Sequence, residues 1–366
     1  MSHNPSQLEE NKLTPILTPP EGSEATRPEP SGLFENNPVR LAPLAELDGC
    51  NILEAGQFSF EQAAELCKLA AILEKLEIWP YHPLDGKIAV TAFFEASTRT
   101  RASFESAILR LDGKVISIAE GRMTGQAKGE SLQDIGEMFN AYADLVIMRH
   151  TRTDAPQLML ENLRVPLINA GNGSGEHPTQ ALADWYALLK WRPSLADPLP
   201  SSEPRLNLGI LGTPGSMRAV KSFLLMALLF RQHIGKVTVI SEMTDPFGAD
   251  VTEHLAGADI EYEVSNDVRE HLPALDVVYM NSIAFLGDSY KSLGARYKLD
   301  ARSPLKEDAV VLHPLARLDE LDTSLDKTPH NLYFSQAHGA VFIRQALLMS
   351  VLGRLEALPD VLNLEV

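Results

Sequence analysis

The chain has 366 residues, of which 45% are hydrophobic, and it carries a formal net charge of −17. This length favours two globular domains, and the acidic balance disfavours nucleic acid as a partner because it repels phosphate at long range. No apolar run is long enough to cross a bilayer, and the two cysteines lack metal-ligand spacing. The N-terminus has no basic-then-apolar signal pattern, so we expect a cytoplasmic protein without membrane or metal.

The first 40 residues are rich in Pro, Ser, Glu and Asn, and they predict a disordered or loosely ordered tail. Apolar residues at helical spacing then predict a helix over residues 59–76. Beyond it the chain alternates between strands, predicted at 87–94, 114–118, 145–148 and 165–169, and helices, predicted at 100–111, 131–141, 155–162 and 178–191. Short buried strands that alternate with helices predict a parallel sheet covered on both faces.

The stretch 191–204 is rich in Pro, Ser and Asp and marks a boundary. A second alternating set follows, with strands predicted at 206–211, 236–240, 260–264, 277–280 and 310–312 and helices at 216–230 and 249–256. The sequence therefore predicts an α/β protein of two doubly wound parallel-sheet domains, residues 41–190 and 205–340, with a ligand cleft between them. Residues 341–366 contain a last helix, to about residue 358, which we expect to pack back on the first domain.

One segment points to a phosphorylated ligand. The strand predicted at 87–94 runs into Glu95-Ala96-Ser97-Thr98-Arg99-Thr100-Arg101 and then into a helix. The start of a helix offers free N–H groups and a positive dipole end, and hydroxyl and guanidinium groups add donors that suit phosphate oxygens. Helix capping alone would explain single Ser or Thr residues but not this unbroken run. Neither a P-loop nor a GxGxxG pattern is present, so nucleotide binding is disfavoured.

The stretch FFEASTRTRASFESA resembles the carbamoyl-phosphate motif of the aspartate and ornithine carbamoyltransferase family. His177-Pro178-Thr179-Gln180, between AGNG and ALAD, resembles the second signature of that family. His313-Pro314-Leu315-Ala316-Arg317 resembles the HPLPR segment of the aspartate enzymes, and the cysteine that marks the ornithine branch is missing there. The resemblance runs from about residue 45 to the end, and it is closest to the catalytic chain of aspartate carbamoyltransferases.

The resemblance implies an enzyme that uses carbamoyl phosphate and needs no cofactor. It implies that His177 donates to the carbamoyl oxygen, that Gln180 holds the carbamoyl nitrogen, and that Arg149 contacts phosphate and carbonyl oxygen. The implied donor site comprises Ser97, Thr98, Arg99, Thr100, Arg149, His177, Gln180, Pro314 and Leu315. Within it, Arg99, Thr100, Arg149, His177 and Gln180 are the implied catalytic residues, because they would grip the leaving phosphate and stabilise the oxyanion.

The loop 121–130 resembles the family loop that reaches into the active site of a neighbouring subunit. Thr124 and Lys128 would be the residues that cross over, so the resemblance implies a homo-oligomer, a trimer or a multiple of trimers. It also implies that Glu95 pairs with Arg218 across the cleft when the two domains close.

The acceptor site departs from the family pattern. Arg218 resembles the arginine that binds the α-carboxylate of the amino acid. Ser282 and Ala284, however, stand where the family carries an arginine and a glutamine for the side-chain carboxylate of aspartate. Losing one partner of a buried carboxylate costs roughly 2–5 kcal/mol, unless Lys128, Arg296 or Arg302 compensates.

Three functions therefore stay open. The first is carbamoyl transfer to an aspartate-like amino acid, giving N-carbamoyl-aspartate and a place in pyrimidine biosynthesis if the acceptor is aspartate. The second is transfer to a different amine, because Ser282 and Ala284 are neutral. The third is a catalytically silent homologue that binds carbamoyl phosphate or a protein partner, against which the complete donor site argues.

Overall fold

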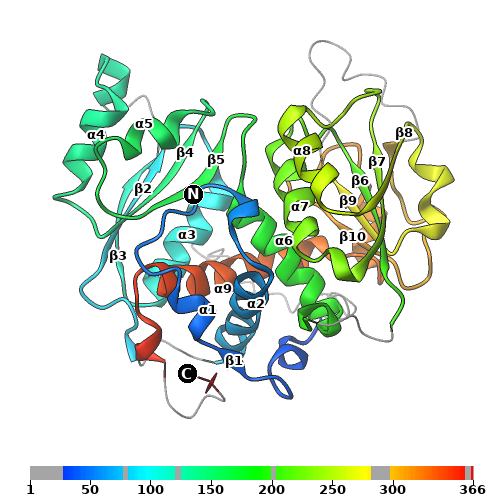
Figure 1. Ribbon diagram of the computed structural model, residues 1–366, viewed down its shortest axis with the longest axis horizontal. Helices are drawn as coiled ribbons and strands as arrows, with labels where there is room; N and C mark the ends of the chain where they lie inside the picture. The colour runs from blue at the N-terminus through cyan, green and yellow to red at the C-terminus, as the bar shows by residue number, and fades with distance from the viewer. Residues whose placement is uncertain are drawn as a thin grey trace, which may run out of the picture.

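The computed structural model describes residues 28–76, 81–119, 125–198, 203–281, 297–358 and 364–365. Two parallel sheets form the two halves of the molecule (Figure 1). The first has the order β3 (Lys114–Ile118), β2 (Ile88–Phe93), β4 (Leu145–His150) and β5 (Leu167–Asn172). The second has the order β10 (Val310–Leu312), β9 (Val277–Met280), β6 (Leu206–Leu211), β7 (Ile234–Ile240) and β8 (Glu261–Ser265). Both sheets are parallel throughout, which confirms the predicted fold class.

Apart from α1, which was not predicted, and α9, the helices lie within a few residues of their predicted positions. They are α1 (Ala42–Ala45), α2 (Phe60–Lys75), α3 (Thr98–Arg110), α4 (Leu132–Phe139), α5 (Ala155–Leu160), α6 (Pro178–Trp191), α7 (Arg218–Leu229), α8 (Ala249–Gly257) and α9 (Tyr333–Val351). Ser59 caps α2 through a reciprocal capping box with Gln62, and Ser131 caps α4. No helix among the described residues is long and apolar enough to span a membrane.

The last helix differs from its prediction. It begins at Tyr333 rather than near residue 341, and it ends at Val351. Figure 1 shows α9 between the two halves, and it packs against α2, α3 and α6. Residues on nearly all sides of α9 are buried. Its apolar residues therefore do not follow a one-sided helical pattern, and the sequence gave no clear signal for where the helix begins.

The predicted tail is partly folded. Residues 28–40 pack against the first half, with Leu33 and Val39 buried and with Arg40 bonded to the buried carboxylate of Glu65. The strand β1 (Val39–Arg40) pairs with β11 (Leu364–Glu365). The prediction of a loose tail is therefore wrong for residues 28–40, because two apolar side chains were enough to anchor them, and residues 1–27 lie outside the described residues.

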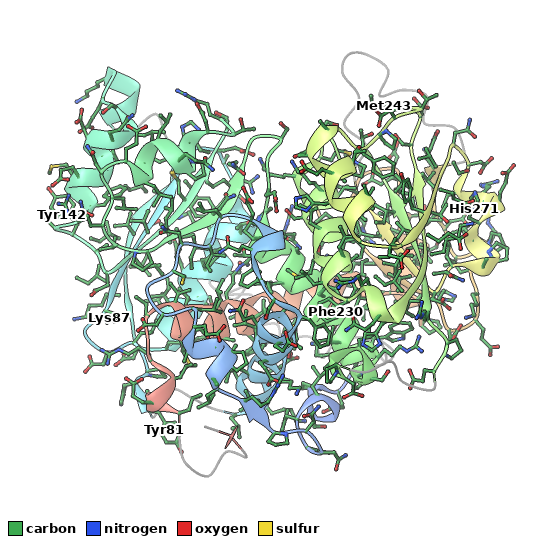
Figure 2. The ribbon with its side chains drawn as sticks, viewed as in Figure 1. Tyr81, Lys87, Tyr142, Phe230, Met243 and His271 are labelled. Atoms are coloured by element: carbon green, nitrogen blue, oxygen red, sulfur yellow. The ribbon has the colours of Figure 1, made fainter. Side chains whose placement is uncertain are left out.

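An aromatic stack joins the halves. The Trp185 ring of α6 stacks on Phe230 at a centroid distance of 4.3 Å, and Phe223 of α7 stacks on Tyr279 of β9 at 4.0 Å. Figure 2 places Phe230 at the junction of the halves, whereas Tyr142 and His271 lie at opposite outer edges. This packing fixes α6 against α7, so the residues at the beginnings of both helices keep a constant spacing.

Candidate active site

A cleft of about 650 Å³ lies between the two halves. Its walls come from the start of α3, the ends of β4, β5 and β9, the starts of α6 and α7, the loop after β10, and α9. The lining includes Ser97, Arg99, Thr100, Arg149, His177, Gln180, Arg218, Asn281, Pro314, Leu315 and Arg344. The structure thus brings together nearly all residues of the predicted donor site, although they are spread over more than 200 positions of the chain.

Fewer residues of the predicted phosphate-binding segment reach the cleft than the run of polar residues from Ser97 to Arg101 suggested. Ser97 is the N-terminal cap of α3 in extended conformation, and its hydroxyl makes no capping bond, so it remains available to a ligand. Thr100 is buried, while Arg99 is exposed at the cleft. Arg101 points away from the cleft, because its guanidinium donates to Ser117 and Glu105 at 3.0 and 3.3 Å. Thr98 is exposed and is not part of the cleft lining.

Glu95 connects two arginines in the cleft. Its carboxylate accepts from Arg149 at 2.8 Å and from Arg218 at 2.7 and 3.0 Å. Burial would raise the pKa of Glu95, but the bonds from Arg218 and the charge of Arg149 lower it below its ordinary value. The pair of Glu95 with Arg218 was expected on domain closure. Both Glu95–Arg218 hydrogen bonds are present in the structure, and they link the two halves.

A glycine permits the close approach of these arginines. Gly171 has a φ of +114°, and a Cβ atom there would lie 3.1 Å from Arg218 and 3.3 Å from Arg149. The Arg218 guanidinium also donates to the Gly173 carbonyl at 2.9 Å. Any larger residue at position 171 would therefore displace both guanidinium groups as well as strain the backbone.

His177 presents a neutral imidazole to the cleft. Its backbone N–H donates to Ser222 of α7 at 2.8 Å, and its Nε2 has no partner. Burial, followed by the charges of Arg149 and Arg218, places the pKa of His177 well below its ordinary value. Thr179 Oγ1 lies 3.5 Å from Nδ1, on the side opposite to Nε2. A neutral ring with a free Nε2 can donate one hydrogen bond to an oxygen in the cleft.

Gln180 belongs to a polar network that the sequence did not reveal. Its Nε2 donates at 2.7 Å to the buried Asp184, one helical turn further along α6. Gln336 of α9 donates to the same carboxylate, and the buried Arg344 lies nearby and lines the cleft. The available signal was a carboxylate four residues after Gln180, in a helix that is mostly apolar.

The segment after β10 also reaches the cleft. Pro314 and Leu315 line it, and Leu315 has a φ of +56° and donates its N–H to His313 Nδ1 at 2.8 Å. The other ring nitrogen of His313 lies 3.0 Å from the buried Glu320. Two hydrogen bonds of one buried histidine therefore fix this loop at the edge of the donor site.

Several predicted residues lie elsewhere. Lys128, at the end of the 3-10 helix Gly125–Lys128, is exposed and does not line this cleft. Arg302, offered above as a substitute for the missing arginine, is exposed and pairs with Asp300 at 3.1 Å. Thr124, Ser282, Ala284 and Arg296 lie outside the described residues. In the part of the chain that the structure describes, no group of three His, Cys, Asp or Glu residues could hold a metal ion.

Comparison with known proteins identifies the family. The family model of the aspartate/ornithine carbamoyltransferase carbamoyl-P binding domain matches residues 51–190, and that of the Asp/Orn binding domain matches residues 205–351. The chain belongs to the aspartate/ornithine carbamoyltransferase family. The predicted family and the predicted class of enzyme, a carbamoyltransferase of the aspartate carbamoyltransferase kind, are thereby confirmed.

Individual relatives agree with this placement. An aspartate carbamoyltransferase catalytic subunit of Clostridium kluyveri is 33% identical over 313 residues, which cover 84% of this chain and 99% of the relative. One of Clostridium botulinum is 36% identical over 318 residues, with the same coverage. The crystal structure of aspartate transcarbamoylase from Trypanosoma cruzi in complex with carbamoyl aspartate and phosphate matches with a TM-score of 0.74 and 31% identity, covering 85% of this chain and 99% of that one. The same enzyme with N-(phosphonacetyl)-L-aspartic acid matches at 0.73 and 30%, covering 85% and 98%.

Proposed function

We propose that the protein transfers the carbamoyl group of carbamoyl phosphate to the amino group of aspartate, with carbamoyl aspartate and phosphate as products. The convergence of Arg99, Arg149, His177 and Gln180 on one cleft is the observation that carries the proposal. The relatives named above are aspartate enzymes, and one related structure holds carbamoyl aspartate with phosphate. The cleft lining offers Ser97, Arg99 and Thr100 as donors for phosphate and Arg218 as a partner for a carboxylate.

In this proposal the neutral amine of the acceptor attacks the carbamoyl carbon. The developing oxyanion accepts hydrogen bonds from Thr100, Arg149 and the neutral His177. The bond to the phosphate oxygen then breaks, the phosphate leaves toward Ser97 and Arg99, and the proton of the amine departs with it. Because no nucleophilic side chain with a paired base lines the described cleft, the reaction proceeds without a covalent enzyme intermediate.

The carbamoyl NH2 group meets acceptors in the same scheme. Gln180, Pro314 and Leu315 line the cleft, and the side-chain oxygen of Gln180 and the backbone carbonyls of Pro314 and Leu315 would accept from the NH2 group. Arg218 holds the α-carboxylate of the acceptor. The halves 41–190 and 205–340 thus act as the carbamoyl-phosphate domain and the amino-acid domain.

A phosphate-release assay over a panel of amines tests the function. We expect release with aspartate as the preferred acceptor. The panel includes amino acids with one carboxylate, because Ser282 and Ala284 are neutral where the family carries side chains for a second carboxylate. Preference for such an amine would replace aspartate as the acceptor, and binding of carbamoyl phosphate without release for any amine would identify a silent homologue.

The active unit in this proposal is a homo-oligomer in the cytoplasm, a trimer or a multiple of trimers. Lys128 is exposed and outside its own cleft, as expected of a residue that serves a neighbouring subunit together with Thr124. Mixing inactive Lys128→Ala and Arg99→Ala subunits tests this arrangement. Shared sites would restore about one intact site per mixed trimer, whereas no recovery after verified subunit exchange would exclude the contribution of Lys128.

A further inference from the structure

Asp184 is a buried acidic residue directly behind the donor site. Its side chain has no exposed surface, and its Oδ1 accepts from Gln180 Nε2 of the same helix at 2.7 Å. The same oxygen accepts from Gln336 Nε2, which comes from α9. One carboxylate oxygen thus receives two amide groups, and both glutamines line the cleft.

The orientation of Gln336 is fixed independently. Its Oε1 accepts from the backbone N–H of His313 at 2.9 Å, and a backbone N–H can only donate. The NH2 group of Gln336 must therefore point the other way, toward Asp184. This fixes the shared Oδ1 position as an acceptor, so Gln180 must also turn its NH2 group toward it.

The orientation of the Gln180 amide decides which of its atoms a ligand in the cleft can meet. Since Gln180 uses its NH2 group on Asp184, its carbonyl oxygen is the amide atom that remains for a ligand. A carbonyl oxygen accepts from an NH2 group but gains nothing from a methyl group. His313 is also the residue before Pro314 and Leu315, so the same network holds this loop, which lines the cleft.

The charged surroundings of Asp184 fit this role. Burial raises the pKa of Asp184 to about 7, against the bonds from Gln180 and Gln336, the Tyr279 hydroxyl of β9 and the charge of Arg344 of α9. Arg344 is the cation that faces it, and Arg344 donates on its other side to Ser103. The oxygen Oδ1 is purely an acceptor in the ionised carboxylate, and it also stays one when the proton is carried by Oδ2.

We propose that Asp184 is a positioning residue that turns the carbonyl oxygen of Gln180 toward the donor and thereby selects carbamoyl phosphate over acyl phosphates without an NH2 group. This rests on the proposed use of carbamoyl phosphate. It assigns the selectivity for the NH2 group to an orienting carboxylate that never touches the ligand.

Binding in the absence of an acceptor tests the proposal. The Kd values of carbamoyl phosphate and of acetyl phosphate, which carries a methyl group in place of NH2, are measured by calorimetry on the full-length protein and its variants. Asp184→Leu keeps the shape of the side chain but removes both acceptor oxygens. We expect its preference for carbamoyl phosphate to fall about tenfold, with the Kd of acetyl phosphate little changed.

Two variants serve as controls. Asp184→Asn keeps an acceptor oxygen opposite the fixed NH2 group of Gln336, so it should retain the preference. Gln180→Met removes the amide itself and should lose as much preference as Asp184→Leu. If the leucine variant does not fold, Asp184→Ala creates the same loss of acceptor without adding methyl groups beside Arg344.

The possible outcomes separate the two claims. An unchanged preference in a folded Asp184→Leu protein, or an equal weakening of both phosphates, would overturn the positioning role and leave the proposed function intact. A loss of preference in Asp184→Asn would overturn it too, because the acceptor is still present. If the wild-type protein binds neither phosphate, both proposals fail.

Discussion

Replacing His177 by alanine should reduce kcat by a factor of about 10² to 10³, equivalent to roughly 2.7–4 kcal/mol of transition-state stabilisation. The magnitude follows from the position of Nε2, which is buried, has no protein partner and lines the cleft. A donor of this kind needs no reorganisation when charge develops on the carbamoyl oxygen. The backbone N–H that anchors this turn to Ser222 remains in the variant, so the fold should be preserved.

The pH dependence of kcat tests whether His177 acts as a neutral hydrogen-bond donor. The pKa of His177 lies well below 6.5 because of burial and the neighbouring arginines, so the ring stays neutral as pH falls through the neutral range. Steady-state kcat, measured from pH 5.5 to 9, should therefore show the same acid limb in the wild type and in His177→Ala. His254→Ala, an exposed histidine of α8, is the matched control and should keep full kcat. A limb near pH 6.5 that vanishes in His177→Ala alone would refute the argument for a neutral donor.

Three further changes test other parts of the site. Arg99→Ala should raise the Kd of carbamoyl phosphate by roughly ten- to a hundredfold and abolish detectable turnover, because charge-assisted hydrogen bonds to phosphate are lost. Near-normal turnover would show that Arg99 does not bind the phosphate. Glu95→Gln leaves the guanidinium groups of Arg149 and Arg218 without their shared carboxylate. The KM for the acceptor should therefore rise about tenfold, and the ligand-induced compaction measured by small-angle scattering should decrease. Unchanged compaction would contradict a role of Glu95 in closing the two halves. Trp185→Ala should lower the free energy of unfolding, measured in urea, by about 3–5 kcal/mol through loss of the inter-half stack; a loss below about 1 kcal/mol would show that the stack is not what joins the halves.

The donor site could be read from local sequence because its residues follow strands. Arg149 is one of the last two residues of the buried strand β4, and Ser97 and His177 follow the ends of β2 and β5. Parallel strands bring those carboxyl ends to one edge. The family resemblance then supplied their roles. Spacing along the chain could not show that Arg101 turns to Ser117 and Glu105, since alternate positions at a helix start face different directions.

The supporting network needed the folded chain. Asp184 lies more than 100 residues before His313 and Gln336 in the chain, and the packing of α9 against α6 brings it to Gln336. From the sequence alone, an aspartate in a mostly apolar helix can have many structural roles. The shared Oδ1, with two amides directed at it, exists only as a tertiary contact.

By itself, the sequence determined the alternation of strands and helices, the boundary near residue 200 and the chemical types that bind phosphate, because these depend on local periodicity and on motifs of a few residues. The tertiary structure decided which polar side chains face the cleft, that Glu95 holds two arginines together, that His177 is neutral and that Gln180 is oriented from behind. Burial, the direction of each hydrogen bond and the sum of nearby charges set these properties, and all three depend on residues that meet only when the two halves pack together.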